Sequence, residues 1–180
     1  MNGRAKSHGL LYVRRSSSRQ EASLLQQLNW AVTKASELDV VLDVNTDDLN
    51  HMIENRLSCH KSMYLDDGVT GADLDRPGFQ AFCAAAKANR QISHLFVHHT
   101  DRFARPEIVT QALNTQVELQ YDGICFVFND RMALPMARGT INVGDVITSL
   151  ISLHESGEFL NKLAQRIVDT KTSLAMGGYW

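Results

Sequence analysis

The feature that most constrains the fold is a regular alternation between short apolar runs and longer segments with helical periodicity. Each apolar run is short enough to be a buried strand and is followed by a polar turn. Between the runs, apolar residues recur at the spacing of an amphipathic helix. Strands separated by helices predict an α/β fold in three layers, with a mostly parallel central sheet of four to five strands and helices on both faces. The predicted strands are Leu10–Val13, Met63–Leu65, Ile92–His98 and Gly123–Phe128.

Helices are predicted between and after these strands, and two of them carry start signals. Asn45 precedes Thr46-Asp47-Asp48, which gives an N-cap followed by acidic residues in the first turn. Pro106 suits the first position of another helix. The four helices are expected from Glu21 to about Glu37, after Asn45, from Phe79 to Lys87, and from Pro106 to about Gln120.

A further helical stretch, from Val143 to about Ala175, is longer than one small domain needs to cover its sheet. Its apolar face fits an oligomer interface or packing within one chain, and the pattern alone favours neither. We therefore expect two parts, an α/β core over residues 1–142 and a long helix with a linker over residues 143–180. The core includes an acidic helical segment at about residues 39–61.

The charge of the chain is unevenly distributed. Its formal net charge is −2, yet residues 1–40 carry six basic and three acidic side chains, whereas residues 43–75 carry two basic and eight acidic ones. A polyanionic partner should therefore meet the first region and avoid most of the second. No apolar run approaches the ~20 residues of a membrane span, and the three scattered cysteines indicate reduced thiols. We expect a cytoplasmic protein with no membrane partner.

Three polar clusters follow three of the predicted strands, at Arg14–Ser18, Asp66–Arg76 and Asp101–Arg105. The carboxyl ends of parallel strands meet at one edge of a sheet, and active sites of α/β proteins lie outside that edge. The clusters together supply hydroxyls, arginines and an acid. These residues are Ser16, Ser17, Ser18, Arg14, Arg76, Arg102, Arg105 and Asp101.

This set of side chains is suited to phosphoryl transfer. Guanidinium groups match phosphate oxygens and stabilise charge that develops on phosphorus without a metal. A hydroxyl beside them can act as a nucleophile. The sequence has no P-loop, no zinc-type histidine spacing and no GxSxG motif, so we expect no cofactor and no metal.

Simpler interpretations exist for each residue type. The three serines also fit N-cap and turn positions of the next helix. Arg102 and Arg105 also fit exposed positions at a helix start, although cations there oppose the helix dipole. Asp66 and Asp67 fit a turn better than a metal pair because they precede a glycine.

Four motifs in order resemble the serine recombinases of the resolvase/invertase type. Tyr12-Val13-Arg14-Arg15-Ser16-Ser17, followed by Ser23-Leu24-Leu25-Gln26-Gln27, is similar to the family's Y-x-R-x-S-[ST]…S-L-x-x-Q signature. Asp66–Phe79 resembles its D-x-x-[ST]-G…R-x-G loop, and Asp101–Arg105 its D-R-[LF]-x-R motif. His154-Glu155-Ser156 stands where the family's long oligomerisation helix carries an acid. The resemblance covers about residues 9–178.

The resemblance implies a role for each residue and selects Ser16 among the three serines. Ser16 would attack a DNA phosphodiester, giving a 5′-phosphoserine intermediate, strand exchange and religation. Arg14, Arg102 and Arg105 would bind the scissile phosphate. Arg76 would be a further phosphate contact, Gln27 would orient the site, and Asp101 would handle the proton of the 3′-oxygen or orient an arginine.

The resemblance also implies partners and a wider context. The substrate would be double-stranded DNA, bound by a homodimer that forms a synaptic tetramer through residues 143–180. In larger members a DNA-binding region begins near the position of Trp180, so we expect the catalytic part of a large serine recombinase. The segment at about residues 39–61 is longer than the usual connection and is interpreted as an insertion.

Two other functions compete with this one. The chain could be a non-catalytic oligomerisation or DNA-associated module that has kept the fold. It could also be a flavodoxin-like protein that binds a nucleotide or another phosphate at the same strand ends.

Overall fold

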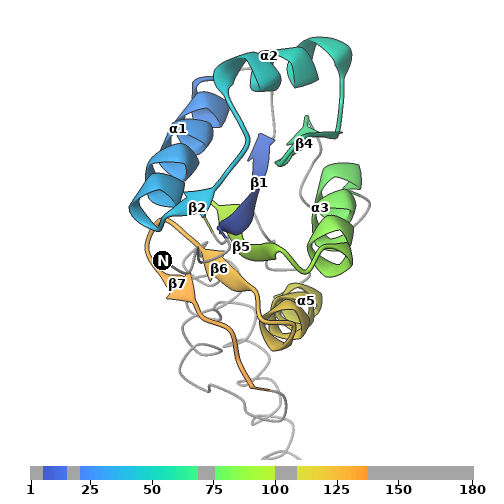
Figure 1. The fold of residues 1–180 in the computed structure, drawn as a ribbon. Helices are drawn as coiled ribbons and strands as arrows, with labels where there is room; N and C mark the ends of the chain where they lie inside the picture. Colours follow the sequence, from blue (N-terminus) through green and yellow to red (C-terminus); the bar gives the residue numbers. More distant parts are fainter. Residues whose placement is uncertain (1–5, 16–20, 69–75, 100–108, 138–180) are drawn as a thin grey trace, which may run out of the picture.

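The computed structural model describes residues 6–15, 21–68, 76–99 and 109–137. Within them the chain forms a central sheet with helices on both faces, as Figure 1 shows. The elements in chain order are β1 (Ser7–Arg15), α1 (Glu21–Glu37), β2 (Val40–Val41), α2 (Thr46–Asn55), β3 (Cys59–His60), β4 (Met63–Asp67), α3 (Pro77–Ala88), β5 (Ile92–Val97), α5 (Val109–Tyr121), β6 (Cys125–Val127) and β7 (Met132–Ala133).

The first strand, β1, lies in the middle of the sheet. The strand order is β3-β4-β1-β5-β6-β7, and β2 also pairs with β1. The pairs β1–β2, β1–β4, β1–β5 and β5–β6 are parallel. The short strands β3 and β7 pair antiparallel at the two edges. The predicted mostly parallel sheet is therefore confirmed, and the carboxyl ends of β1, β4 and β5 lie at one edge.

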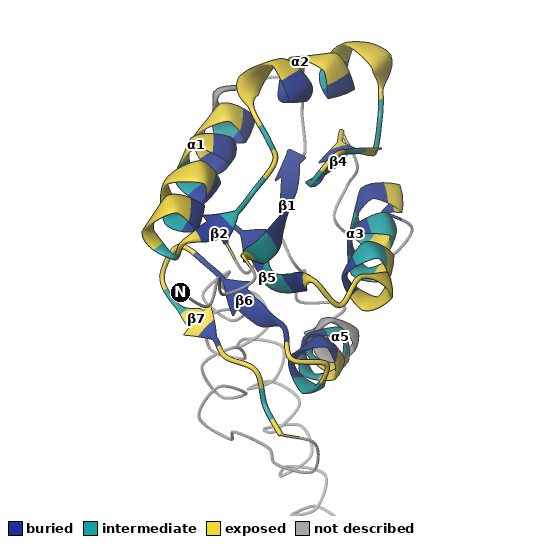
Figure 2. Cartoon of the chain, viewed as in Figure 1, coloured by how far each residue is buried: buried dark blue, intermediate teal, exposed yellow. Residues whose placement is uncertain are grey.

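Side chains of β1 alternate between two apolar clusters, one on each face of the sheet. Leu11 and Val13 pack with residues of α1 and α2, whereas Leu10 and Tyr12 pack with residues of α3 and α5. Figure 2 shows both pairs of helices turning their buried sides toward the sheet. The central strand is thus covered twice, which explains why its sequence is a continuous apolar run rather than an alternating one.

The helix after Asn45 begins as the sequence predicts. The Asn45 side chain accepts a hydrogen bond from the backbone N–H of Asp48 at 2.8 Å, and Arg56 ends the helix in a left-handed conformation with φ 52°. Leu49 and Met52 then bury the apolar face of α2 against the sheet. The acidic segment therefore contributes to the core of this domain.

Within the described residues, the strands β1, β4, β5 and β6 and the four helices agree with the sequence prediction, but three short strands were missed. The strands β2, β3 and β7 have two residues each, too few for any periodic signal. The predicted long helix at Val143 to about Ala175 lies outside the described residues. In the part of the chain that the structure describes, no helix is long and apolar enough to cross a bilayer.

Candidate functional site

The described part of the site lies at the carboxyl ends of β1 and β4. Their parallel register pairs Arg14 with Asp66 and Arg15 with Asp67. Since neighbours in register point to the same face, the first pair lies with Tyr12 on the α3 side of the sheet. The second pair lies on the α1 side. One edge of the sheet therefore carries two charged pairs on opposite faces.

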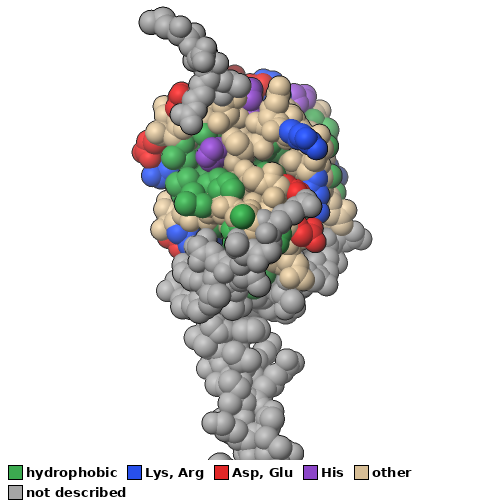
Figure 3. Space-filling model, turned by 60° about the horizontal axis from the view of Figure 1, so that its bottom comes forward, with side chains coloured by type: hydrophobic (Ala, Val, Ile, Leu, Met, Phe, Trp, Pro, Cys, Tyr) green, Lys and Arg blue, Asp and Glu red, His purple; other side chains and the backbone are tan. Residues whose placement is uncertain are grey.

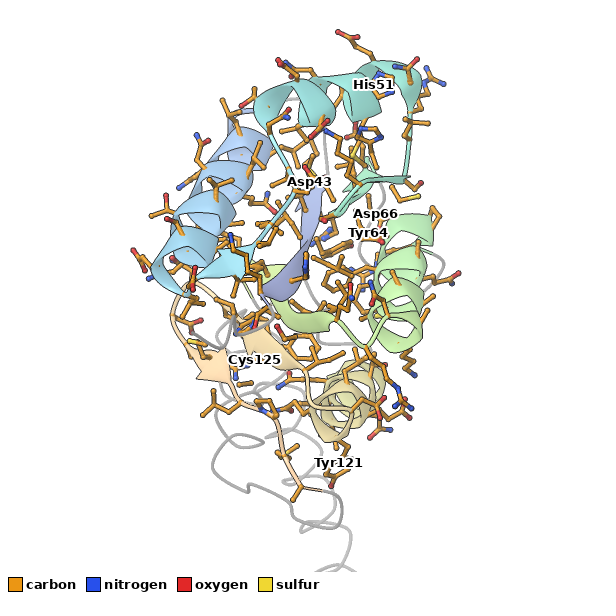
Figure 4. The ribbon with its side chains drawn as sticks, viewed as in Figure 1. Asp43, His51, Tyr64, Asp66, Tyr121 and Cys125 are labelled. Atoms are coloured by element: carbon orange, nitrogen blue, oxygen red, sulfur yellow. The ribbon has the colours of Figure 1, made fainter. Side chains whose placement is uncertain are left out.

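Asp66 joins three elements through hydrogen bonds. Its Oδ1 accepts the backbone N–H of Gly78 at 2.9 Å, and its Oδ2 accepts the N–H of Phe79 at 3.0 Å and the hydroxyl of Tyr12 at 2.8 Å. Figure 4 shows Asp66 between β4 and α3. Arg76, at the N-cap position of α3, makes no side-chain capping bond. The carboxylate of Asp66 on β4 therefore caps the N-terminus of α3. Its negative charge there also interacts favourably with the helix dipole.

The close approach of α3 to β4 depends on Gly78. A Cβ atom on this residue would lie 2.5 Å from the carbonyl oxygen of Leu65 and 3.0 Å from Oδ1 of Asp66. The helix could not come close enough to be capped by Asp66 if the residue carried a side chain. The geometry of the cap thus explains the glycine of the motif Arg76-Pro77-Gly78.

Arg76 is buried with only 1% of its surface exposed. Its Nη1 donates to the hydroxyl oxygen of Tyr12 at 3.3 Å, and its guanidinium carbon lies 4.5 Å from the centre of the Phe79 ring. Arg14 is also buried, with 3% exposed. Two guanidinium groups therefore lie on the α3 side of the strand ends, where their charges are poorly screened.

The hydroxyl of Tyr12 lies between the carboxylate and the guanidinium. Burial raises its pKa far above the ordinary value of a tyrosine, and the positive charges of Arg76 and Arg14 oppose that rise. The phenol therefore stays neutral, so that it donates to Asp66 and accepts from Arg76.

On the other face of the sheet, Arg15 binds Asp67 through two contacts. Nε lies 2.5 Å from Oδ1 and Nη2 lies 2.7 Å from Oδ2. The hydrogen bond from Arg15 lowers the pKa of Asp67 below its ordinary value. This bidentate pair ties the end of β1 to the end of β4.

Gln27 holds the main chain of Arg14 from α1. Its Oε1 accepts the N–H of Arg14 at 3.3 Å, and its Nε2 donates to the carbonyl oxygens of Arg14 at 3.1 Å and of Ser23 at 3.0 Å. The pairing of β1 with β5 ends two residues before Arg14, at Tyr12 and Val97. The Gln27 amide thus continues the ladder beyond the last residue of β5.

The structure therefore brings together three of the seven predicted site residues, namely Arg14, Arg76 and Gln27. Ser16, Asp101, Arg102 and Arg105 lie outside the described residues. Sequence reasoning gave no role to Tyr12, Asp66 or Arg15. Their signals were membership in the quoted motifs and a position in or just after predicted strands.

Several acidic side chains of residues 43–75 have partners in the same chain. Among the described residues, three of these acids bind groups of the same chain. Asp48 lies 2.9 Å from Nζ of Lys61 and 3.2 Å from Nε2 of His60, and Asp66 and Asp67 have the partners given above. On the face seen in Figure 3, basic and acidic side chains are interspersed. Arg15, which lies outside residues 43–75, therefore offsets one charge of the formal −6 through its ion pair with Asp67.

A hollow of about 380 Å³ adjoins the end of β4. Arg56, Ser58, Asp67 and Pro77 are among the residues that line it. Across the described ranges, no three His, Cys, Asp or Glu side chains are grouped closely enough to hold a metal ion. The cysteines make no disulfide, and burial raises the pKa of Cys83 to about 12 and that of Cys125 to about 11.

Comparisons with known proteins found similar solved structures and one family model. No curated protein matches the chain. A resolvase family site-specific recombinase from Streptococcus pneumoniae matches with a TM-score of 0.52 and 17% identity, over 92% of this chain and 99% of that one. The C-terminal catalytic domain of ISC1926 TnpA, an IS607-like serine recombinase, matches with a TM-score of 0.50 and 15% identity, over 94% and 99%. At these identities the likeness concerns the fold.

The family model of the resolvase N-terminal domain matches residues 9–158, which is most of the chain and includes all four motifs described above. The α/β fold described above is similar to that of the two solved structures. The protein therefore belongs to the resolvase N-terminal domain family.

Proposed function

We propose that this chain is the catalytic domain of a serine-type site-specific DNA recombinase. Membership in the resolvase family supports site-specific recombination in general. The observation that carries the specific proposal is the pair of buried guanidinium groups, Arg14 and Arg76, at the carboxyl ends of β1 and β4. Ser16 follows the last residue of β1 directly in the chain.

In each step of the proposed chemistry, one phosphate ester bond forms as another breaks. The Ser16 hydroxyl attacks the scissile phosphorus, the bond to the 3′-oxygen breaks, and that oxygen leaves as a 3′-OH after taking up a proton. The product is a 5′-phosphoserine ester, and attack by a 3′-OH reverses the reaction and frees the serine. Since one phosphodiester is exchanged for another, neither ATP nor a metal is required by the energetics.

Each remaining site residue receives a role from the family motif and its position. Arg14, Arg102 and Arg105 bind the phosphate and stabilise its charge in the transition state. Arg76 adds positive charge to the same site. Asp101 handles the proton of the 3′-oxygen or orients an arginine. Gln27 keeps Arg14 in place through its main chain.

The proposed assembly is also inferred from the family resemblance. Double-stranded DNA is the substrate, a homodimer binds it, and two dimers form a synaptic tetramer. Residues 143–180 provide the interface between subunits, while residues 1–142 form the catalytic core.

Covalent capture tests the proposal directly. The full chain, with any DNA-binding region that follows it in its gene, is incubated with supercoiled plasmids that carry the DNA flanking that gene. Denaturation, nuclease digestion and mass spectrometry then locate nucleotide adducts on the protein. We expect an adduct on Ser16 in the wild type and none in Ser16→Ala, while Ser17→Ala keeps it.

Two results would contradict this assignment. Cleavage by Ser16→Ala would exclude Ser16 as the nucleophile. Tight binding of a free nucleotide without any DNA adduct would favour a phosphate-binding protein of the same fold instead.

A further inference from the structure

We propose that Gln120 is a latch that fixes residues 134–136 against the end of α5 and so sets the course by which the chain leaves the core. The end of α5 leads into the start of β6, so the latch lies at the amino ends of the parallel strands, opposite the edge that carries the site. The inference rests on the proposed function in one respect, because residues 143–180, which follow the latched segment, are there assigned the interface between subunits.

The latched segment follows β7, the strand at one edge of the sheet. β7 pairs with β6 only through Met132 and Ala133, so the regular ladder ends at Ala133. The chain then continues beyond the ladder toward the last described residue, Ala137, as the orange end of the ribbon in Figure 1 shows. The side chain of Leu134 is 58% exposed, so apolar packing does not hold it in place.

Gln120 supplies two hydrogen-bond partners to this segment. Its Nε2 donates to the carbonyl oxygen of Leu134 at 2.7 Å, and its main-chain oxygen accepts the N–H of Met136 at 3.0 Å. Pro135 stands between these two residues, and its ring fixes its own φ and restricts the backbone of Leu134. One residue of α5 therefore binds the segment on both sides of a stiff proline.

A second buried glutamine orients the first. Gln116, one turn earlier on α5, donates from Nε2 to Oε1 of Gln120 at 3.3 Å, which leaves the amide nitrogen of Gln120 to face Leu134. Both glutamines are buried, although the buried neighbours Leu119 and Ile124 are apolar. An apolar side chain at position 120 would avoid the cost of burying an amide. Packing therefore does not account for this glutamine, whereas its bond to Leu134 does.

The end of β1 is held in a comparable way. There Gln27 binds the N–H and the C=O of Arg14 beyond the last residue pair with β5. Gln120 likewise binds one C=O and one N–H beyond the last residue pair of β7. In both places a buried glutamine from a covering helix takes the position of a missing neighbouring strand.

A fixed exit from the core has a consequence for assembly. A segment that is ordered before subunits meet does not have to be ordered when they associate, and this preorganisation raises affinity. Without the side chain of Gln120, the bond to Leu134 is lost and the segment keeps only its bond through Met136. Opening of the latch should therefore weaken the contact between subunits without changing the strand ends of the site.

The first test is amide hydrogen exchange, resolved by residue in NMR spectra of the full chain. We expect the Met136 amide to exchange about 10-fold faster in Gln120→Met, because the segment then opens locally, while the amides of β6 keep their rates. Gln116→Met is the matched control, since it removes a buried glutamine of the same helix but leaves the donor to Leu134. It should change exchange at Met136 by less than about 2-fold. Unchanged exchange in Gln120→Met, or equal acceleration in both variants, would overturn the inference.

The second test measures self-association of the full chain by analytical ultracentrifugation. Gln120→Met should weaken it about 5- to 10-fold, whereas Gln116→Met should leave it within about 2-fold. The double variant Gln116→Met/Gln120→Met leaves no unpaired amide in the core, so it repeats both tests if the single variant does not fold, and it should behave as Gln120→Met. Equal association of the wild type and Gln120→Met would overturn the inference. A wild type that does not associate would contradict the proposed assembly alone, and the exchange rates would still decide on the latch.

Discussion

Replacement of Gln27 by methionine isolates the contribution of one buried side chain to the end of β1. The side chain is 2% exposed and holds both the N–H and the C=O of Arg14. Methionine has a similar length and would fill the space, but it can satisfy neither group. The variant therefore leaves two backbone groups buried without their partner on that side of the strand.

The expected loss follows from those two groups. Each buried polar group deprived of its partner costs about 1–3 kcal/mol, so the free energy of unfolding should fall by about 2–6 kcal/mol for the two groups. That is a large part of the ~5–15 kcal/mol available to a domain of ordinary stability. The neighbouring change Gln26→Met, on the exposed side of α1, should cost less than about 0.5 kcal/mol.

Urea unfolding followed by circular dichroism measures both changes. We expect a lower midpoint for Gln27→Met with an unchanged slope, because the core itself remains intact. The reasoning would be refuted if Gln27→Met lost less than about 1 kcal/mol, or no more than Gln26→Met. Either result would mean that water replaces the amide at the end of β1.

Two further predictions concern the contact between β4 and its neighbours. Gly78→Ala should lower the free energy of unfolding by about 1–3 kcal/mol, since its Cβ would meet the backbone of Leu65 at 2.5 Å; an unchanged thermal midpoint would show that α3 can move away freely. Asp67→Asn should destabilise the protein by about 1–2 kcal/mol at pH 7. Because Arg15 lowers the pKa of Asp67, this difference is present above the unfolded-state pKa of ~3.9 and disappears as the pH falls below the folded-state value. A difference that persists at pH 2 in unfolding experiments would contradict the ion-pair explanation.

The layers of the fold could be predicted from sequence because their signals are local. The apolar run before Arg14 and the helical stripe after Glu21 each lie within one element, and the Asn45 cap needs only the next three residues. The two-residue strands could not be predicted in the same way. A strand such as β2 is defined by its partner, since Val40 pairs with Ser7 far away in the sequence.

The site also has features that local sequence signals predict and features that depend on distant residues. Arg14 and Arg76 could be placed at strand ends from the pattern of runs and turns. The role of Asp66 could not, because the helix that it caps begins after an intervening loop and the bond depends on the distance between β4 and α3. Capping rules consider only the residues next to the start of a helix, whereas the cap of α3 comes from the strand β4.

The central position of β1 has a consequence for how the protein is made. The strand is synthesised before its partners β4 and β5 and before the helices that cover its two faces. Its fully apolar run therefore stays unpaired until the chain has emerged through β5. Folding must wait for contacts between distant parts of the sequence, which makes it slow and leaves the nascent chain open to aggregation. During synthesis the apolar run of β1 is therefore an exposed segment of the kind that chaperones bind.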